Sequence, residues 1–226
     1  MTAPGPFSDI HDPIPRWDTQ SDLLTSLAVH DLEQGGEVKP SCVAFQGEQA
    51  VFLTTLRPFT TGGHHRPVLE VLAVAAGLGA DRLMISLAGR AWSLEDPIPP
   101  VSEDGDLRQP VLTIHSVDGS TTPPLSLNRL RAYDRTETGE VRLGEMICEV
   151  NALGFIPSAL AVAASEATPV PVPGTDQAAA LITQISRCER LGHRFAWSTD
   201  TAAYLDVLLD QFRGRGGDVE VQRCTG

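Results

Sequence analysis

Short β-rich segments separated by short turns occupy the middle of the sequence, and this pattern limits the folds open to the chain. Residues 42–45 and 50–56 are two such segments, and the connection between them is short enough for a hairpin. Residues 125–133 and 141–150 form a second pair of this kind. Because a hairpin pairs its strands antiparallel, the pattern predicts a largely antiparallel sheet.

Helical spacing of apolar residues appears before and after the first hairpin. It covers residues 19–32 and again residues 67–76, where Pro67 suits the first helical position. Further strands are expected at residues 82–87 and 111–117. The order over residues 41–150 is therefore β-β-α-β-β-β-β, which is typical of the α+β class with helix packed on one face of the sheet.

After residue 150 the sequence pattern changes from mainly strand-forming to mainly helix-forming. The expected elements are an Ala-rich helix around residues 159–167, a helix over 176–191, and a strand, helix and strand over 195–197, 202–212 and 219–221. Residues 168–174 alternate proline with other residues and cannot be helical, so they are interpreted as a stiff linker. We therefore expect an extended arm (1–17), an α+β domain (18–150) and a C-terminal helical and β-α-β region (151–226).

Charge excludes several classes of function. The chain of 226 residues has 29 acidic and 17 basic residues, which give a net charge of −12. The negative electrostatic field of a chain with this charge repels phosphate backbones and anionic lipid, so neither general nucleic-acid binding nor membrane binding is expected. The longest apolar region, residues 67–80, contains Glu70 and falls short of the ~20 residues that cross a bilayer.

Cysteine usage and the first residues indicate the compartment. The four cysteines are widely spaced and form no C-x-x-C pair, which is typical of buried thiols in a reducing cytoplasm. Residues 1–10 have neither a basic nor an apolar stretch, so no secretory signal is predicted. Lys39 is the single lysine, a bias that indicates a GC-rich bacterial genome. We expect a cytoplasmic protein.

The strongest local feature is Gly62-Gly63-His64-His65-Arg66, directly ahead of Pro67. A glycine-rich turn into a helix exposes backbone N–H groups at the positive end of the helix dipole, beside two imidazoles and a guanidinium. This combination predicts a site for a phosphate, sulfate or carboxylate. The alternative is a surface turn with solvated side chains, because the motif is neither a P-loop nor a dinucleotide fingerprint.

A metal site is a second interpretation of the same histidines. Glu70 lies six and five positions after His64 and His65, whereas ligands on one helix face are three or four apart. His115 or His11 could complete a site only through space. The sequence therefore predicts no metal and no cofactor.

An acidic segment follows the strand expected at residues 82–87. Its carboxylates are Glu95, Asp96, Glu103, Asp104 and Asp106, and no basic residue lies among them. No EF-hand register is present, so a calcium loop is not predicted. We expect an irregular exposed loop that either keeps the chain soluble or docks a basic partner.

Catalytic signatures were not found. The sequence has no G-x-S-x-G elbow and no cysteine–histidine signature, and Cys42 fits a core position better than a nucleophile. Arg213-Gly-Arg-Gly-Gly217 resembles a fragment of an RNA-binding segment, but its place after a helix favours a stop signal.

Residues 80–93 and 106–119 together resemble an uncharacterised group of small α+β proteins from bacteria and phages. The resemblance spans about residues 50 to 145 and implies an α+β fold without a known activity. The group carries acidic residues near two positions where this chain has Arg90 and Pro110. If those acids are functional, this chain does not share the activity.

Three functions remain open from the sequence. The first is a non-enzymatic accessory or regulatory protein that binds a protein partner or a second copy of itself. The alternative is a binding protein or enzyme for a small anionic ligand at the turn between Gly62 and Pro67. A third, weaker hypothesis is nucleic-acid mimicry or toxin neutralisation by the acidic surface.

Overall fold

A computed structural model describes residues 16–34, 36–60, 62–91, 101–102, 105–106 and 108–214. Its elements are α1 (Arg16–Glu33), β1 (Ser41–Gln46), β2 (Gln49–Thr55), α2 (His65–Gly77), β3 (Arg82–Ala91), β4 (Val101–Ser102), β5 (Gly105–Asp106), β6 (Gln109–Asp118), β7 (Leu125–Arg135), β8 (Val141–Val150), α3 (Phe155–Ser165), α4 (Asp176–Leu191), β9 (Arg194–Trp197) and α5 (Thr199–Gly214). The predicted α+β class is confirmed.

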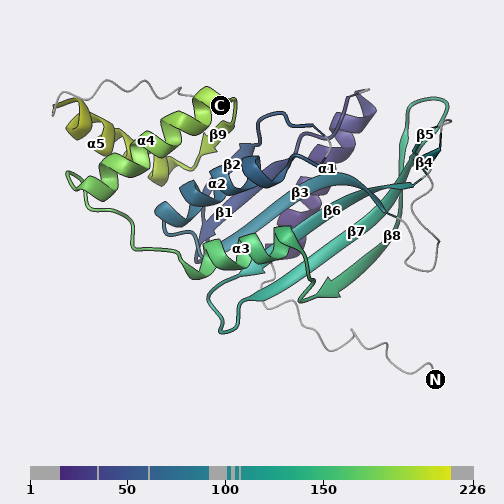
Figure 1. The fold of residues 1–226 in the computed structure, drawn as a ribbon, viewed down its shortest axis with the longest axis horizontal. Helices are drawn as coiled ribbons and strands as arrows, with labels where there is room; N and C mark the ends of the chain where they lie inside the picture. Colours follow the sequence, from purple (N-terminus) through teal and green to yellow (C-terminus); the bar gives the residue numbers. More distant parts are fainter. Residues whose placement is uncertain are drawn as a thin grey trace.

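Seven strands form one sheet in the order β8-β7-β6-β3-β1-β2-β9 (Figure 1). Every pair of neighbours is antiparallel, so the expected sheet type is confirmed. The two predicted hairpins are β1–β2 and β7–β8. β6 returns beside β3 in an unbroken register, with Ile85 opposite His115.

Helices cover both faces of the sheet, which corrects the expectation of helix on one face. Cys42 and Ala44 point from β1 towards the core that contains α2, α3 and α4. Val43 and Phe45 point the other way and pack with Leu24 of α1. Because successive side chains of a strand alternate between faces, apolar residues at adjacent positions of β1 require cover on both sides.

The C-terminal elements belong to the same sheet. β9 pairs with β2, with Leu53 opposite Ala196. α4 has the predicted bounds: the Thr175 hydroxyl caps its start, and Gly192 ends it with φ 104°. The strand predicted at 219–221 and the N-terminal residues 1–15 lie outside the described residues.

Two local expectations need correction. Pro67 is the third residue of α2 and not the first, because the helix already begins at His65. Proline is tolerated there since the first-turn N–H groups lack partners inside a helix. The segment predicted as an irregular loop contains the paired two-residue strands β4 and β5.

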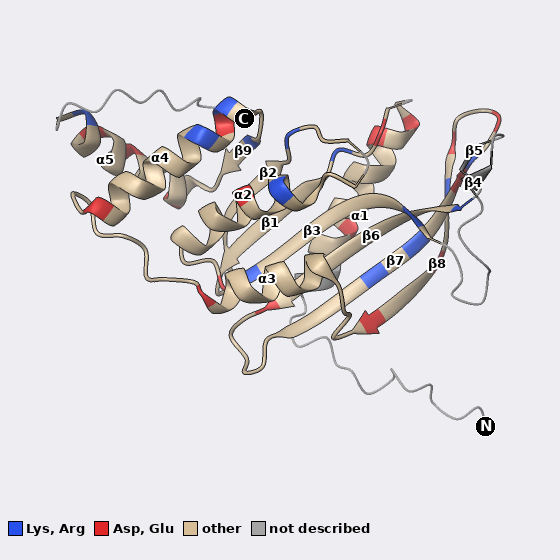
Figure 2. Cartoon of the chain, in the orientation of Figure 1, with Lys and Arg blue, Asp and Glu red and all other residues tan. Residues whose placement is uncertain are grey.

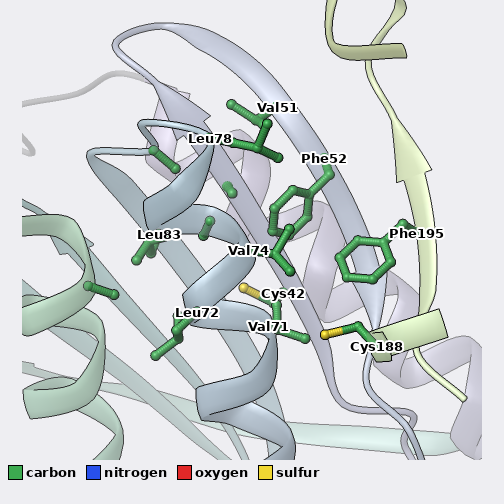
Figure 3. Packing of buried hydrophobic residues seen from close by; sticks show 14 of the residues in the cluster. Cys42, Val51, Phe52, Val71, Leu72, Val74, Leu78, Leu83, Cys188 and Phe195 are labelled. Carbon is green, nitrogen blue, oxygen red and sulfur yellow. The ribbon is translucent and has the colours of Figure 1, made fainter. Parts of the chain in front are cut away.

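The main core lies between the sheet and helices α2, α3, α4 and α5. Figure 3 shows the part of it around α2. Phe52 of β2 meets Phe195 of β9 edge to face, with ring centroids 5.3 Å apart. Val71 and Val74 of α2 lie beside these rings and are at most 1% exposed. Aromatic pairs of this geometry add to the burial term, so the contact fixes β9 against the sheet.

Candidate functional site

α2 and α3 lie side by side on the sheet and run in the same direction. At their first residues, the ring centroids of His65 and Phe155 are 3.9 Å apart. At the other end, the N–H of Thr168 donates to the carbonyl of Ala76 over 3.3 Å. The N-terminal ends of the two helices therefore meet at one place, above β3, β6 and β7 (Figure 1).

Neither helix neutralises its own N-terminal end. The N-cap residues are His64 and Gly154, and neither makes a side-chain capping hydrogen bond in the described chain. Neither first turn contains an acidic residue. Since the exposed N–H groups of a helix start carry partial positive charge, two such ends reinforce each other here.

Three histidines gather at this place. The rings of His64 and His65 are 4.5 Å apart. Burial, and then the neighbouring His65, lower the pKa of His64. On β6, burial lowers the pKa of His115 to about 4, with a smaller contribution from His64. Burial therefore disfavours the charged form of both His64 and His115.

The predicted anion-binding residues are therefore close together, but most of them already contact protein. The N–H of Gly63 donates to the carbonyl of Thr60 over 2.8 Å, and Gly62 takes the positive φ of 79° that the turn needs. His65 stacks on Phe155, and Arg66 Nε lies 3.1 Å from Glu70 Oε1. Phe155 and His115 join this cluster only through the fold, and no local sequence signal connects them to it.

Glu70 is the centre of a buried polar network that the sequence analysis missed. Its carboxylate accepts hydrogen bonds from Arg57 Nε at 2.7 Å and from Arg66 Nε at 3.1 Å. Burial alone raises the pKa of Glu70, but the hydrogen bonds of Arg57 and His193 outweigh it and bring the pKa to about 2. The network joins the end of β2 to α2 and to the turn before β9.

The hydrogen bonds of His193 define its tautomer. The backbone N–H of Arg57 donates to Nδ1 at 3.2 Å, so Nδ1 is the acceptor. Nε2 therefore carries the proton and donates to Glu70 Oε2 at 3.0 Å. The side chain is fully buried, and burial lowers its pKa although Glu70 opposes the shift. A buried, neutral imidazole that makes a hydrogen bond at each ring nitrogen has a structural role.

The outer surface of α2 and α3 contains no carboxylate. We call it the α2–α3 face and define it by His65, Arg66, Leu69 and Ala73 of α2, Phe155, Ser158, Val162 and Ser165 of α3, and Leu153 in the preceding turn. Glu70, the single acidic residue of α2, is buried, and α3 has no charged residue at all (Figure 2). Leu69, Leu153 and Val162 are 50%, 95% and 54% exposed.

The other predicted sites have limited support. Of the predicted acidic partner site, Glu95, Asp96, Glu103 and Asp104 lie outside the described residues, and for Asp106 only its place in β5 is described. Within the described ranges, no group of three or more His, Cys, Asp or Glu side chains could hold a metal ion. No described helix combines the length and the apolar character needed to span a membrane.

Comparison with known proteins gave no match to a family model, to a curated protein or to a solved structure. The resemblance described above for residues 50 to 145 therefore stays a prediction.

Proposed function

We propose that this chain is a non-enzymatic accessory protein that binds a protein partner through the α2–α3 face. The observation that carries the proposal is the composition of α3, whose sequence FIPSALAVAAS has no charged residue although one side of the helix faces outward. A helix on a protein surface normally presents charged or polar residues to water, and one that is apolar around its circumference is typical of a buried helix.

The exposed apolar residues adjoin one another. Leu69 follows His65 by one helical turn, and Val162 follows Phe155 by two turns. Because His65 contacts Phe155 and the helices run in the same direction, these two rows of side chains lie next to each other. Contiguous exposed apolar surface of this kind marks protein–protein contact sites more often than scattered single residues do.

The state of two buried thiols argues against either of them as a nucleophile. Burial raises the pKa of Cys42 to about 12, and burial together with Glu70 raises the pKa of Cys188 to about 12. Both therefore stay protonated at neutral pH, whereas a nucleophilic cysteine needs the thiolate. The Cys188 thiol also donates to the backbone carbonyl of Glu70 and has no imidazole partner among its described contacts.

A photo-crosslinking amino acid tests the proposal in producing cells. We would place it at Val162 and, as a matched control, at Val207 of α5, which is 48% exposed. An adduct with a protein that forms from position 162 and not from position 207 is the expected result. No adduct from position 162, or equal adducts from both positions, would overturn the proposal.

A second candidate is a small-anion site at residues 62–66, and the meeting of two uncapped helix N-termini favours it. A thermal-shift screen with phosphate, sulfate and carboxylates tests it, since a ligand at 100 times its Kd stabilises by ~2.7 kcal/mol. The shift should disappear in Arg66→Ala and persist in Arg142→Ala, whose side chain is 72% exposed. Equal shifts in both variants would exclude this site.

A further inference from the structure

We infer that the partner of the α2–α3 face is a second copy of this chain, bound through a two-fold axis that sets the helix pairs of the two copies antiparallel. This inference rests on the proposed function and names its partner. It follows from the direction of the two helices and from the charges at the two ends of the face.

The parallel arrangement of α2 and α3 makes the face electrically asymmetric. Parallel helix dipoles add, whereas antiparallel dipoles cancel. The N-terminal end has two uncapped helix starts together with His65 and Arg66, and Arg66 is 71% exposed. The C-terminal end has the negative ends of both helix dipoles and exposed Glu166 just after α3.

A face of this kind is complementary to itself. A two-fold axis through its middle places the positive end of one copy on the negative end of the other, twice in the same interface. Each helix then lies on its own counterpart, so Glu166 faces the start of α3 in the second copy, where His65 packs on Phe155. The middle of the contact contains Leu69 and Val162 from both copies, so apolar surface meets apolar surface.

The distribution of acidic residues favours the same contact. Each copy has a net charge of −12, so a symmetric contact between surfaces that carry carboxylates would bring like charges together. Within the described part of the chain, the outward positions of α2 and α3 have none. The α2–α3 face can therefore be shared by two copies without opposing like charges, which are costly across an interface.

Sedimentation of the purified full chain over a wide range of concentration tests the inference. The expected result is a reversible dimer. Val162→Asp should raise the dissociation constant about tenfold or more, because each copy would bury an unpaired charge. Val207→Asp on α5 should leave it unchanged. A chain that stays monomeric to its solubility limit, or a dimer that both variants weaken equally, would overturn the inference.

A charge exchange tests the orientation. Glu166→Arg and His65→Glu should each weaken the dimer, and the double variant should recover part of the loss, because it restores opposite charges between the copies. Circular dichroism and urea unfolding would check that each variant folds, since His65 also packs on Phe155. No recovery in a folded double variant contradicts the antiparallel arrangement.

The crosslinking experiment separates the two proposals. An adduct from position 162 with the mass of two chains supports both. An adduct with a different protein, combined with a monomeric purified chain, overturns the dimer and leaves the proposed function standing. No adduct from position 162 together with a monomeric chain overturns both.

Discussion

The Nε2 of His193 lies 3.0 Å from Oε2 of Glu70, a residue 123 positions earlier in the chain. This hydrogen bond, together with the pairing of Arg57 and Glu70, connects α2 to the turn that leads into β9. The C-terminal elements are thus held to the sheet by a buried polar contact as well as by the packing of Phe195.

Glu70→Gln tests how much this network contributes to the free energy of unfolding. The amide keeps the shape of the side chain, but it removes the negative charge that faces Arg57. Its NH2 group is a hydrogen-bond donor and would face other donors where the carboxylate accepted. Because breaking one partner of a buried ion pair leaves the other unpaired, we expect a loss of about 3 kcal/mol in the free energy of unfolding. Urea titration measures it, and the exposed control Glu37→Gln should stay within about 0.5 kcal/mol.

The same carboxylate should make the protein sensitive to acid. Its pKa falls from the ordinary 4.5 to about 2 in the folded state. The stabilisation is therefore complete above pH 4.5 and disappears as the pH falls towards 2, since the unfolded chain takes up the proton first. Urea titrations across this range should show a declining stability, and the decline should be shallower in Glu70→Gln.

His115 should cause a separate decline in the free energy of unfolding, at higher pH than the decline caused by Glu70. The pKa of His115 falls from 6.5 to about 4 on folding, so the unfolded state binds a proton between these values and the folded state does not. Stability should be complete above pH 6.5 and fall towards pH 4, by at most about 1.4 kcal/mol per pH unit for one proton. His115→Gln should flatten this part of the profile, and an unchanged slope would contradict the assignment.

Gly119→Ala tests the packing of α3 against the end of β6. A Cβ at this position would lie 2.7 Å from Cβ of Ala164 and 2.8 Å from its carbonyl carbon. Because the clash is with helix backbone, it cannot be relieved by a rotamer change, and we expect a loss of about 1–3 kcal/mol in thermal unfolding. Gly89→Ala is the control, since its nearest neighbour is 3.9 Å away.

Two substitutions in α3 separate its inner side from its outer side. Leu160 is fully buried, and Leu160→Ala should cost about 2–5 kcal/mol through lost burial and a cavity. Val162 is 54% exposed, and Val162→Ala should change the stability of the isolated chain by less than about 0.5 kcal/mol. Equal losses in urea unfolding would show that the orientation of α3 is wrong.

The local pattern predicted the elements but not their neighbours. The hairpins β1–β2 and β7–β8 and the bounds of α4 follow from turn residues, alternation and caps, which act over a few residues. The place of β9 beside β2 depends on residues such as Thr54 and Arg194, which are 140 positions apart. Both faces of the sheet are apolar in its middle strands, so α1 could pack on either. The helical periodicity of α1 does not show which face it covers.

The candidate site was predicted in part. The sequence indicated residues 62–66 because glycines, imidazoles and a helix start stand together there. It named His115 only as a residue that could join these histidines through space, and it missed Phe155, which reaches the same place from a second helix. It also treated Glu70 as a failed metal ligand, because its partners Arg57 and His193 have no spacing that a motif could reveal.

The late position of β9 in the chain has a consequence for synthesis on the ribosome. β2 emerges long before β9, so the edge of β2 that faces away from β1 has no partner strand for most of translation. The Glu70 carboxylate is likewise made well before His193 can reach it. During this interval the nascent chain is exposed to wrong strand pairing, and slower elongation between the two strands would lengthen it.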